Sequence, residues 1–148
     1  MNNIRPNNTL MNIKSLLKSG FVAGFIINIS AIAMVPMVGD QFDTVLASRN
    51  LPPLNNMAML FFCGLSFVMG FFLVWLYALA KNQIGPGMKT AAFVSIVFWF
   101  FAYLVPNVSM VVYGFMPIRL TVIGTGWGLV ELLVASTVGS RLYKDIKN

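Results

Sequence analysis

The sequence predicts an all-α membrane protein, an antiparallel bundle of four transmembrane helices. The chain has 148 residues, of which 58% are hydrophobic and 9% are charged, whereas a soluble domain carries about a quarter charged residues. Its mean hydropathy is +0.81. Four apolar runs, each close to the roughly 20 residues that a helix needs to cross a bilayer, take up nearly the whole chain. We therefore expect residues 1–148 to form one membrane domain.

The first span is expected at about residues 20–38, after Lys14 and Lys18. A basic start before an apolar run is also typical of a secretory signal peptide, and residues 31–33 (Ala-Ile-Ala) loosely resemble a cleavage site. The apolar run reaches Val38 without a break, which is longer than the apolar core of most signal peptides. We therefore favour a transmembrane span, and keep the signal peptide as the alternative.

The other elements are expected in order along the chain: an external loop at 40–56, a second span at 57–80, a cytoplasmic turn at 81–87, a third span at 88–105 and a fourth span at 119–140. Helical spacing of Phe42, Val45 and Leu46 makes a short interfacial helix plausible within the external loop. Pro106 ends or kinks the third span. Residues 107–117 are still apolar, and either extend the third helix or lie along the interface. Aromatic residues near span ends are expected to anchor the helices at the membrane surface, namely Trp75, Tyr77, Tyr103, Tyr113 and Tyr143.

The distribution of basic residues predicts the orientation of the helices. In a four-span arrangement one side carries eight basic residues, Arg5, Lys14, Lys18, Lys81, Lys89, Arg141, Lys144 and Lys147, and the other carries Arg49 and Arg119. Because cytoplasmic loops are enriched in Lys and Arg, we expect both termini in the cytoplasm. The formal net charge of +6 comes from residues that flank the apolar runs. It therefore indicates contact with the lipid bilayer and its anionic head groups, with no nucleic acid as partner.

The sequence lacks the patterns of the common catalytic and metal sites. It has no His, one Cys (Cys63) and four acidic residues, and it shows neither a phosphate-binding Gly-rich loop nor a nucleophile elbow. We therefore expect no metal, no cofactor and no enzymatic activity.

One acidic residue, Glu131, falls inside a predicted span. It lies ten residues from Arg141 and twelve from Arg119, which places it about 15 Å and 18 Å from the two ends of the helix. A carboxyl group near the bilayer midplane is costly, so we expect it to face other helices or a cavity and to carry a proton.

Two other polar side chains are predicted at the depth of Glu131. Asn28 lies ten residues after Lys18 on the first span, and Trp99 lies ten residues after Lys89 on the third. We expect the amide of Asn28 and the indole N–H of Trp99 to form hydrogen bonds with the carboxyl group in an intramembrane polar layer.

Glycines at helical spacing predict close helix packing. Gly20 and Gly24 lie four residues apart on the first span, as do Gly124 and Gly128 on the fourth. Small residues at this spacing let two helices approach closely. We expect these positions to pack against other helices, and some of the small-residue faces to bind a protein partner or a second copy in a homo-oligomer.

Three segments resemble a known group of proteins: residues 74–78 (Val-Trp-Leu-Tyr-Ala), 85–87 (Gly-Pro-Gly) and 127–131 (Trp-Gly-Leu-Val-Glu). They resemble small bacterial membrane proteins of about this length, with four predicted spans and no established activity. The resemblance implies a multi-pass protein of a bacterial cytoplasmic membrane. It also implies that the Gly-Pro-Gly turn and Glu131 belong to a shared pattern, but it implies no mechanism.

Two functional hypotheses follow from these observations. The first is a non-enzymatic structural or interaction protein, in which Glu131 is an interhelical hydrogen-bonding group. The alternative is a small proton- or ligand-binding carrier that uses the carboxyl group of Glu131.

Overall fold

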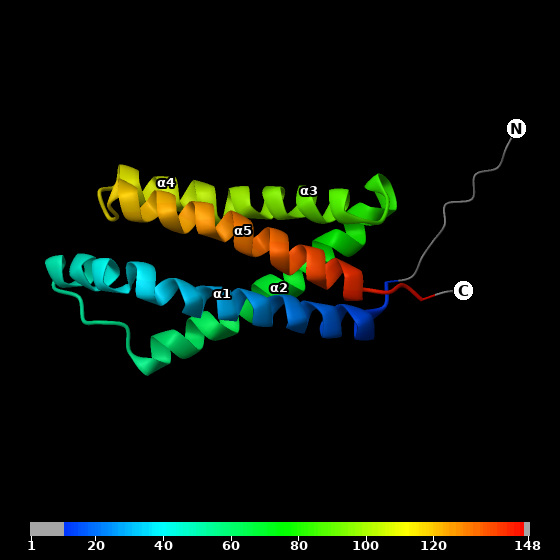
Figure 1. Cartoon of the computed structure of the whole chain (residues 1–148), viewed down its shortest axis with the longest axis horizontal. Helices are drawn as coiled ribbons and strands as arrows, with labels where there is room; N and C mark the ends of the chain where they lie inside the picture. The colour runs from blue at the N-terminus through cyan, green and yellow to red at the C-terminus, as the bar shows by residue number, and fades with distance from the viewer. Residues whose placement is uncertain (1–10, 147–148) are drawn as a thin grey trace, which may run out of the picture.

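The computed structural model describes residues 11–146, which form helices and no strands (Figure 1). The helices are α1 (Ile13–Ser48), α2 (Asn56–Ile84), α3 (Met88–Trp99), the short π-helix η1 (Phe100–Leu104), α4 (Val105–Val112) and α5 (Ile118–Leu142). Because α3, η1 and α4 run on as one helix, the described chain has four helices long and apolar enough to cross a membrane. The predicted all-α, four-span fold class is confirmed.

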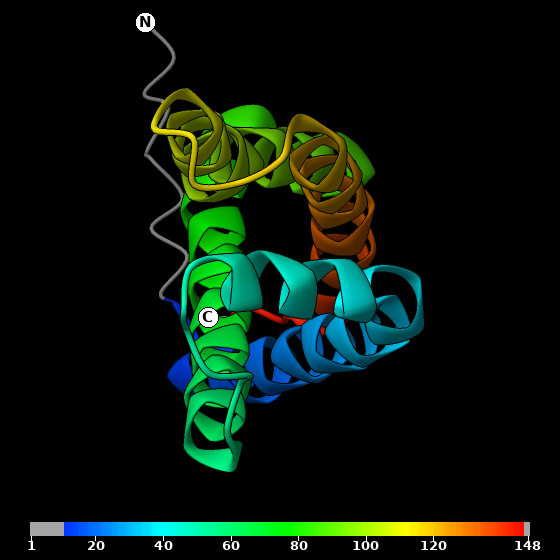
Figure 2. The ribbon, with the colours of Figure 1, turned by 90° about the vertical axis from the view of Figure 1, so that its left-hand side faces the viewer.

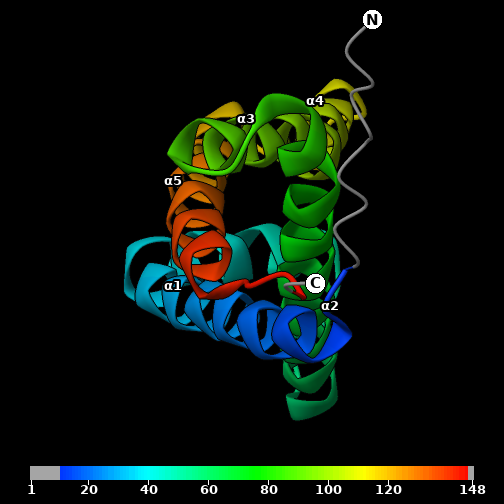
Figure 3. The same ribbon diagram turned by 90° about the vertical axis from the view of Figure 1, so that its right-hand side faces the viewer.

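The four long helices alternate in direction along the chain (Figure 1). The start of α1, the α2–α3 turn and the end of α5 lie together at one end of the molecule. Seen along the long axis, α1, α2, α3 and α5 form the four sides of a ring (Figure 3). Of the eight basic residues predicted to share one side, Arg5 and Lys147 lie outside the described residues. Which end faces the cytoplasm stays a prediction.

Large apolar side chains point outward from each of the long helices. Examples are Phe25, Ile32, Leu60, Phe101 and Val122, each at least half exposed. Such a surface is stable in contact with lipid and unstable in water. The chain is therefore a multi-pass membrane protein in contact with the bilayer.

Helix α1 is longer than the sequence predicts. It continues through Pro36 to Ser48, so that most of the expected external loop is helical and continuous with the first span. Proline removes one backbone donor and bends a helix without always ending it, and the two halves of α1 do run in different directions (Figure 2). The guanidinium of Arg49, which follows α1, donates to the Gly114 carbonyl and lies 5.1 Å from the centre of the Phe115 ring. These contacts hold the end of α1 against the α4–α5 turn.

The third span also extends past its predicted end. Residues 107–112 continue the helix as part of α4, which decides between the two alternatives for this stretch. Pro106 lies in the first turn of α4, directly after η1. Because its ring would clash with the carbonyl four residues earlier, the wider turn of η1 lets the helix continue past the proline.

Helices α1 and α2 cross at three glycines. A Cβ atom on Gly70 would lie 2.2 Å from the Gly24 nitrogen and 2.6 Å from the Gly20 carbonyl oxygen. The two backbones are therefore too close for any larger residue at the crossing.

Polar contacts join the chain segments at the end where α1 begins. Lys81 forms an ion pair with Asp145 and lies 4.4 Å from the centre of the Tyr143 ring. The Tyr143 hydroxyl accepts a hydrogen bond from the Asn12 backbone at 3.3 Å. The segment after α5 is thus attached both to the start of α1 and to the end of α2.

Candidate ligand-binding cavity

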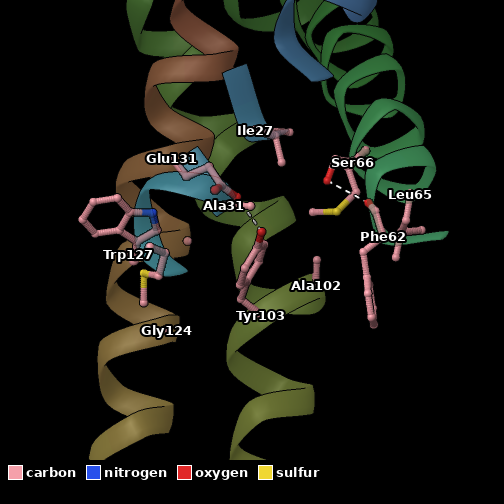
Figure 4. A pocket seen from close by; sticks show the side chains of 13 residues that line it. Ile27, Ala31, Phe62, Leu65, Ser66, Ala102, Tyr103, Gly124, Trp127 and Glu131 are labelled. Atoms are coloured by element: carbon pink, nitrogen blue, oxygen red, sulfur yellow. Dashed lines mark hydrogen bonds between the residues drawn. The ribbon is translucent and has the colours of Figure 1, made fainter. Parts of the chain in front are cut away.

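A cavity of about 630 Å³ lies between α1, α2, η1 and α5. Its walls are largely apolar, and include Ile27 and Ala31 of α1, Phe62 and Leu65 of α2, and Trp127 of α5 (Figure 4). Three of the walls come from α1, α2 and α5, and η1, which continues α3, supplies the fourth. The volume is within the range of about 300–1,000 Å³ that small-molecule sites occupy.

The carboxyl group of Glu131 lies in the wall of this cavity (Figure 4). Its side chain is 7% exposed, and Oε1 accepts a hydrogen bond from the Tyr103 hydroxyl at 2.7 Å. The Ser30 hydroxyl is a second hydrogen-bond partner of the carboxyl group, and it accepts the indole N–H of Trp127 at 2.8 Å. The Glu131 carboxyl group therefore joins α5 to both α1 and η1.

Two local features allow Tyr103 to reach Glu131. Tyr103 belongs to η1, where the widened turn changes the direction in which side chains leave the helix. Its ring packs against Gly128 of α5, where an added Cβ atom would lie only 2.5 Å from the ring. Gly128 thus leaves the space that the Tyr103 ring occupies.

The two predicted hydrogen bonds from Asn28 and Trp99 to Glu131 are wrong. Both amide protons of Asn28 go to backbone carbonyls, of Gly24 at 3.0 Å and of Cys63 at 3.3 Å. The single indole proton of Trp99 goes to the Thr125 carbonyl at 2.8 Å. The prediction matched positions along the helix axes, but hydrogen bonding also depends on the direction in which each side chain leaves its helix.

The four glycines predicted at packing positions have different surroundings. Gly20 and Gly24 lie against the backbone of α2 at Phe71 and Phe67, and Gly128 lies against the Tyr103 ring. Gly124 has no atom of another helix within 4 Å of an added Cβ atom, and it lines the cavity instead.

The site predicted from the sequence did not include Tyr103, Ser30 or Trp127. Tyr103 was expected to be an interfacial anchor, yet its hydroxyl lies inside the molecule. One signal was available, because long side chains in a helix point back toward the N-terminus. A tyrosine one turn after Trp99 can therefore place its hydroxyl at the depth predicted for the polar layer.

The polar groups of the cavity wall are few. The described residues contain no group of three or more His, Cys, Asp or Glu that could hold a metal ion. The polar side-chain groups of the residues that line the cavity are the Glu131 carboxyl, the hydroxyls of Tyr103 and Ser66, and the indole N–H of Trp127, which donates to Ser30. These groups can donate or accept hydrogen bonds and can exchange a proton.

Comparisons of the chain with protein-family models, with curated proteins and with solved structures found no match.

Proposed function

We propose that this chain is a membrane-embedded binding protein that holds a small, mainly apolar ligand in the cavity beside Glu131. The observation that supports this proposal is open volume next to a buried carboxyl group. Ligand sites typically combine apolar walls with a few polar groups that orient the ligand. We further propose that the ligand is bound without chemical change, and that the protein lies in a bacterial cytoplasmic membrane with both termini in the cytoplasm.

Reducing the cavity volume tests this proposal. Gly124→Leu would place a side chain in the cavity, whereas Gly126→Leu, two residues later on the exposed side of the same helix, would not. We expect saturable binding of adamantanol or decanol to the purified wild-type protein in detergent, measured by isothermal titration calorimetry. Binding should weaken at least tenfold in Gly124→Leu and stay unchanged in Gly126→Leu, by analogy with other apolar cavities that a side chain fills. Equal binding to all three proteins, or none to any, would contradict the proposal.

The alternative is a structural or interaction protein, and the hydrogen bonds of Glu131 to Tyr103 and Ser30 support it. In that role Glu131 would link α5 to η1 and α1 without binding a ligand. Glu131→Gln preserves hydrogen-bonding groups, whereas Glu131→Ala removes them and leaves the Tyr103 hydroxyl without its partner. The structural role predicts that only Glu131→Ala lowers the stability in detergent, by about 1–3 kcal/mol. A defect confined to ligand binding in Glu131→Gln, with normal stability, favours the binding role.

A further inference from the structure

The cavity wall contains one acidic side chain and no basic one to balance it. Among the described residues that line it, Glu131 is the sole carboxylic acid, and neither Lys nor Arg is present. The groups that form hydrogen bonds with the carboxyl group are the neutral hydroxyls of Tyr103 and Ser30. Hydroxyl donors stabilise a carboxylate but do not neutralise its charge.

A cation is the ligand that complements such a wall. An unpaired ionised carboxylate in an apolar site is costly, whereas one that is paired with a cation at hydrogen-bond distance is stabilised. A neutral ligand gains only a hydrogen bond, and an anion is repelled. We expect Glu131 to carry a proton in the absence of a cation, and a positively charged group is the one that pairs with the carboxylate once that proton is lost.

Aromatic rings beside the carboxyl group add to this preference. The rings of Trp127 of α5 and Tyr103 of η1 line the same cavity as Glu131 (Figure 4). The face of an aromatic ring attracts an ammonium group, most strongly where water is excluded. The remaining walls are apolar and suit a hydrocarbon body.

The cavity opens toward the lipid-facing surface of α2. Phe62 and Leu65 line it, and their side chains are 51% and 41% exposed. A ligand that partitions into the bilayer could therefore reach Glu131 without passing through water.

We propose that the ligand class of this cavity is a hydrophobic amine, bound as the ammonium ion to the carboxylate of Glu131, with its hydrocarbon part against the apolar walls. This inference rests on the proposed binding function and specifies the chemistry of its ligand.

Three probes of the same shape and different charge test it: adamantylamine, adamantanol and adamantanecarboxylate. Titration calorimetry on the full chain in detergent should show the amine binding about tenfold or more tightly than the alcohol, and no binding of the carboxylate. In Glu131→Gln the amine should lose this advantage, so that the ratio of the two dissociation constants approaches one. Gly126→Leu is the matched control and should keep the preference of the wild type.

The pH dependence of amine binding is a second measurement, which needs no variant. Affinity should rise with pH as the carboxyl group loses its proton, and fall again once the amine itself is deprotonated. Tyr103 of η1 is the titratable group that faces Glu131, while α1 and α2 present the neutral hydroxyls of Ser30 and Ser66. The rise is therefore assigned to Glu131, and it should be absent in Glu131→Gln.

The outcomes distinguish failure of the amine preference from failure of ligand binding itself. Equal binding of amine and alcohol to the wild type overturns the amine preference and leaves the binding function standing. An amine preference that persists in Glu131→Gln also overturns it, because the cation would then bind elsewhere. If Glu131→Gln does not fold, amine binding to the wild type that is independent of pH over the acidic range overturns the inference. No binding of any probe contradicts the binding function itself.

Discussion

Tyr103 and Glu131 show how a glycine can create a polar contact inside a membrane protein. The Tyr103 hydroxyl donates to Glu131 at 2.7 Å, and the Tyr103 ring fills the space beside Gly128. Glu131 and Gly128 lie three residues apart and therefore on one face of α5. The ring and its hydroxyl are thus held by two positions of the same helix face.

The Gly128→Ala substitution should displace this tyrosine. The added methyl group would lie 2.5 Å from the Tyr103 ring, which is closer than van der Waals contact allows. Overpacking of this kind costs about 1–3 kcal/mol, and we expect that loss in the free energy of unfolding, measured by denaturant titration in mixed micelles. Gly126→Ala is the control, because nothing lies within 4 Å of its added methyl group. Equal stability of the two variants would show that the ring moves aside without cost.

At the scale of helices, the crossing of α1 and α2 depends on close backbone contact. Gly70 of α2 lies against Gly24 and Gly20 of α1, and Asn28 ties the same two helices together by donating to the Cys63 carbonyl. Within a bilayer helices associate through packing and hydrogen bonds, since lipid is as apolar as their side chains. The crossing is therefore more sensitive to side-chain size than to hydrophobicity.

Gly70→Ala should separate these helices. Its methyl group would lie 2.2–2.6 Å from backbone atoms of Gly24 and Gly20, which cannot rotate away as a side chain can. We expect a loss of stability of about 1–3 kcal/mol and a lower melting temperature by circular dichroism in detergent. Gly64→Ala, on the same helix with open space around the added methyl group, should have no such effect. A wild-type melting temperature in Gly70→Ala would refute the close crossing.

The segment that follows α5 should make the fold sensitive to high pH. Burial raises the pKa of the Tyr143 phenol above its ordinary value of 10.0, and the nearby carboxylate of Asp145 raises it further. The folded state therefore holds this proton more tightly than the unfolded state. The stabilisation is fully present below about pH 10 and is lost as pH rises through the higher pKa of the folded state.

Tyr143→Phe checks this pH dependence. The variant cannot ionise at this position. Its stability should therefore fall less between pH 9.5 and 11.5 than that of the wild type, which loses the stabilisation due to the raised pKa of Tyr143. Thermal melts in detergent at a series of pH values measure the difference. Tyr113→Phe alters an exposed phenol and should follow the wild type. Parallel curves for Tyr143→Phe and the wild type would exclude the effect.

At the scale of the whole molecule, the excess of basic residues at one end predicts the orientation in the membrane. In a Cys63→Ser background, Leu54→Cys and Ile84→Cys place single thiols at exposed positions at opposite ends of α2. We expect a membrane-impermeant maleimide to label Leu54→Cys in intact cells, and Ile84→Cys only after lysis, because the α2–α3 turn is on the basic side. The reverse labelling pattern would show that the orientation is opposite to the predicted one.

The amino-acid sequence alone determined that the chain is helical and spans a membrane four times. Long apolar segments cross a bilayer as α-helices, because a helix satisfies each backbone donor and acceptor within the same segment. The sequence also identified Glu131 as the intramembrane carboxyl group, because a charged residue within an apolar run is evident from its position. It placed the helix ends less well, because neither Pro36 nor Pro106 stops its helix.

The partners of Glu131 and the cavity beside it were decided by tertiary structure. Position along a helix can be counted from the sequence, and Asn28 and Trp99 were assigned to the polar layer on that basis. The direction of a side chain depends on helix rotation and crossing, and here the Tyr103 ring of η1 lies in the space beside Gly128 of α5. This contact between residues far apart in the sequence brings the Tyr103 hydroxyl to Glu131, beside the cavity that both residues line.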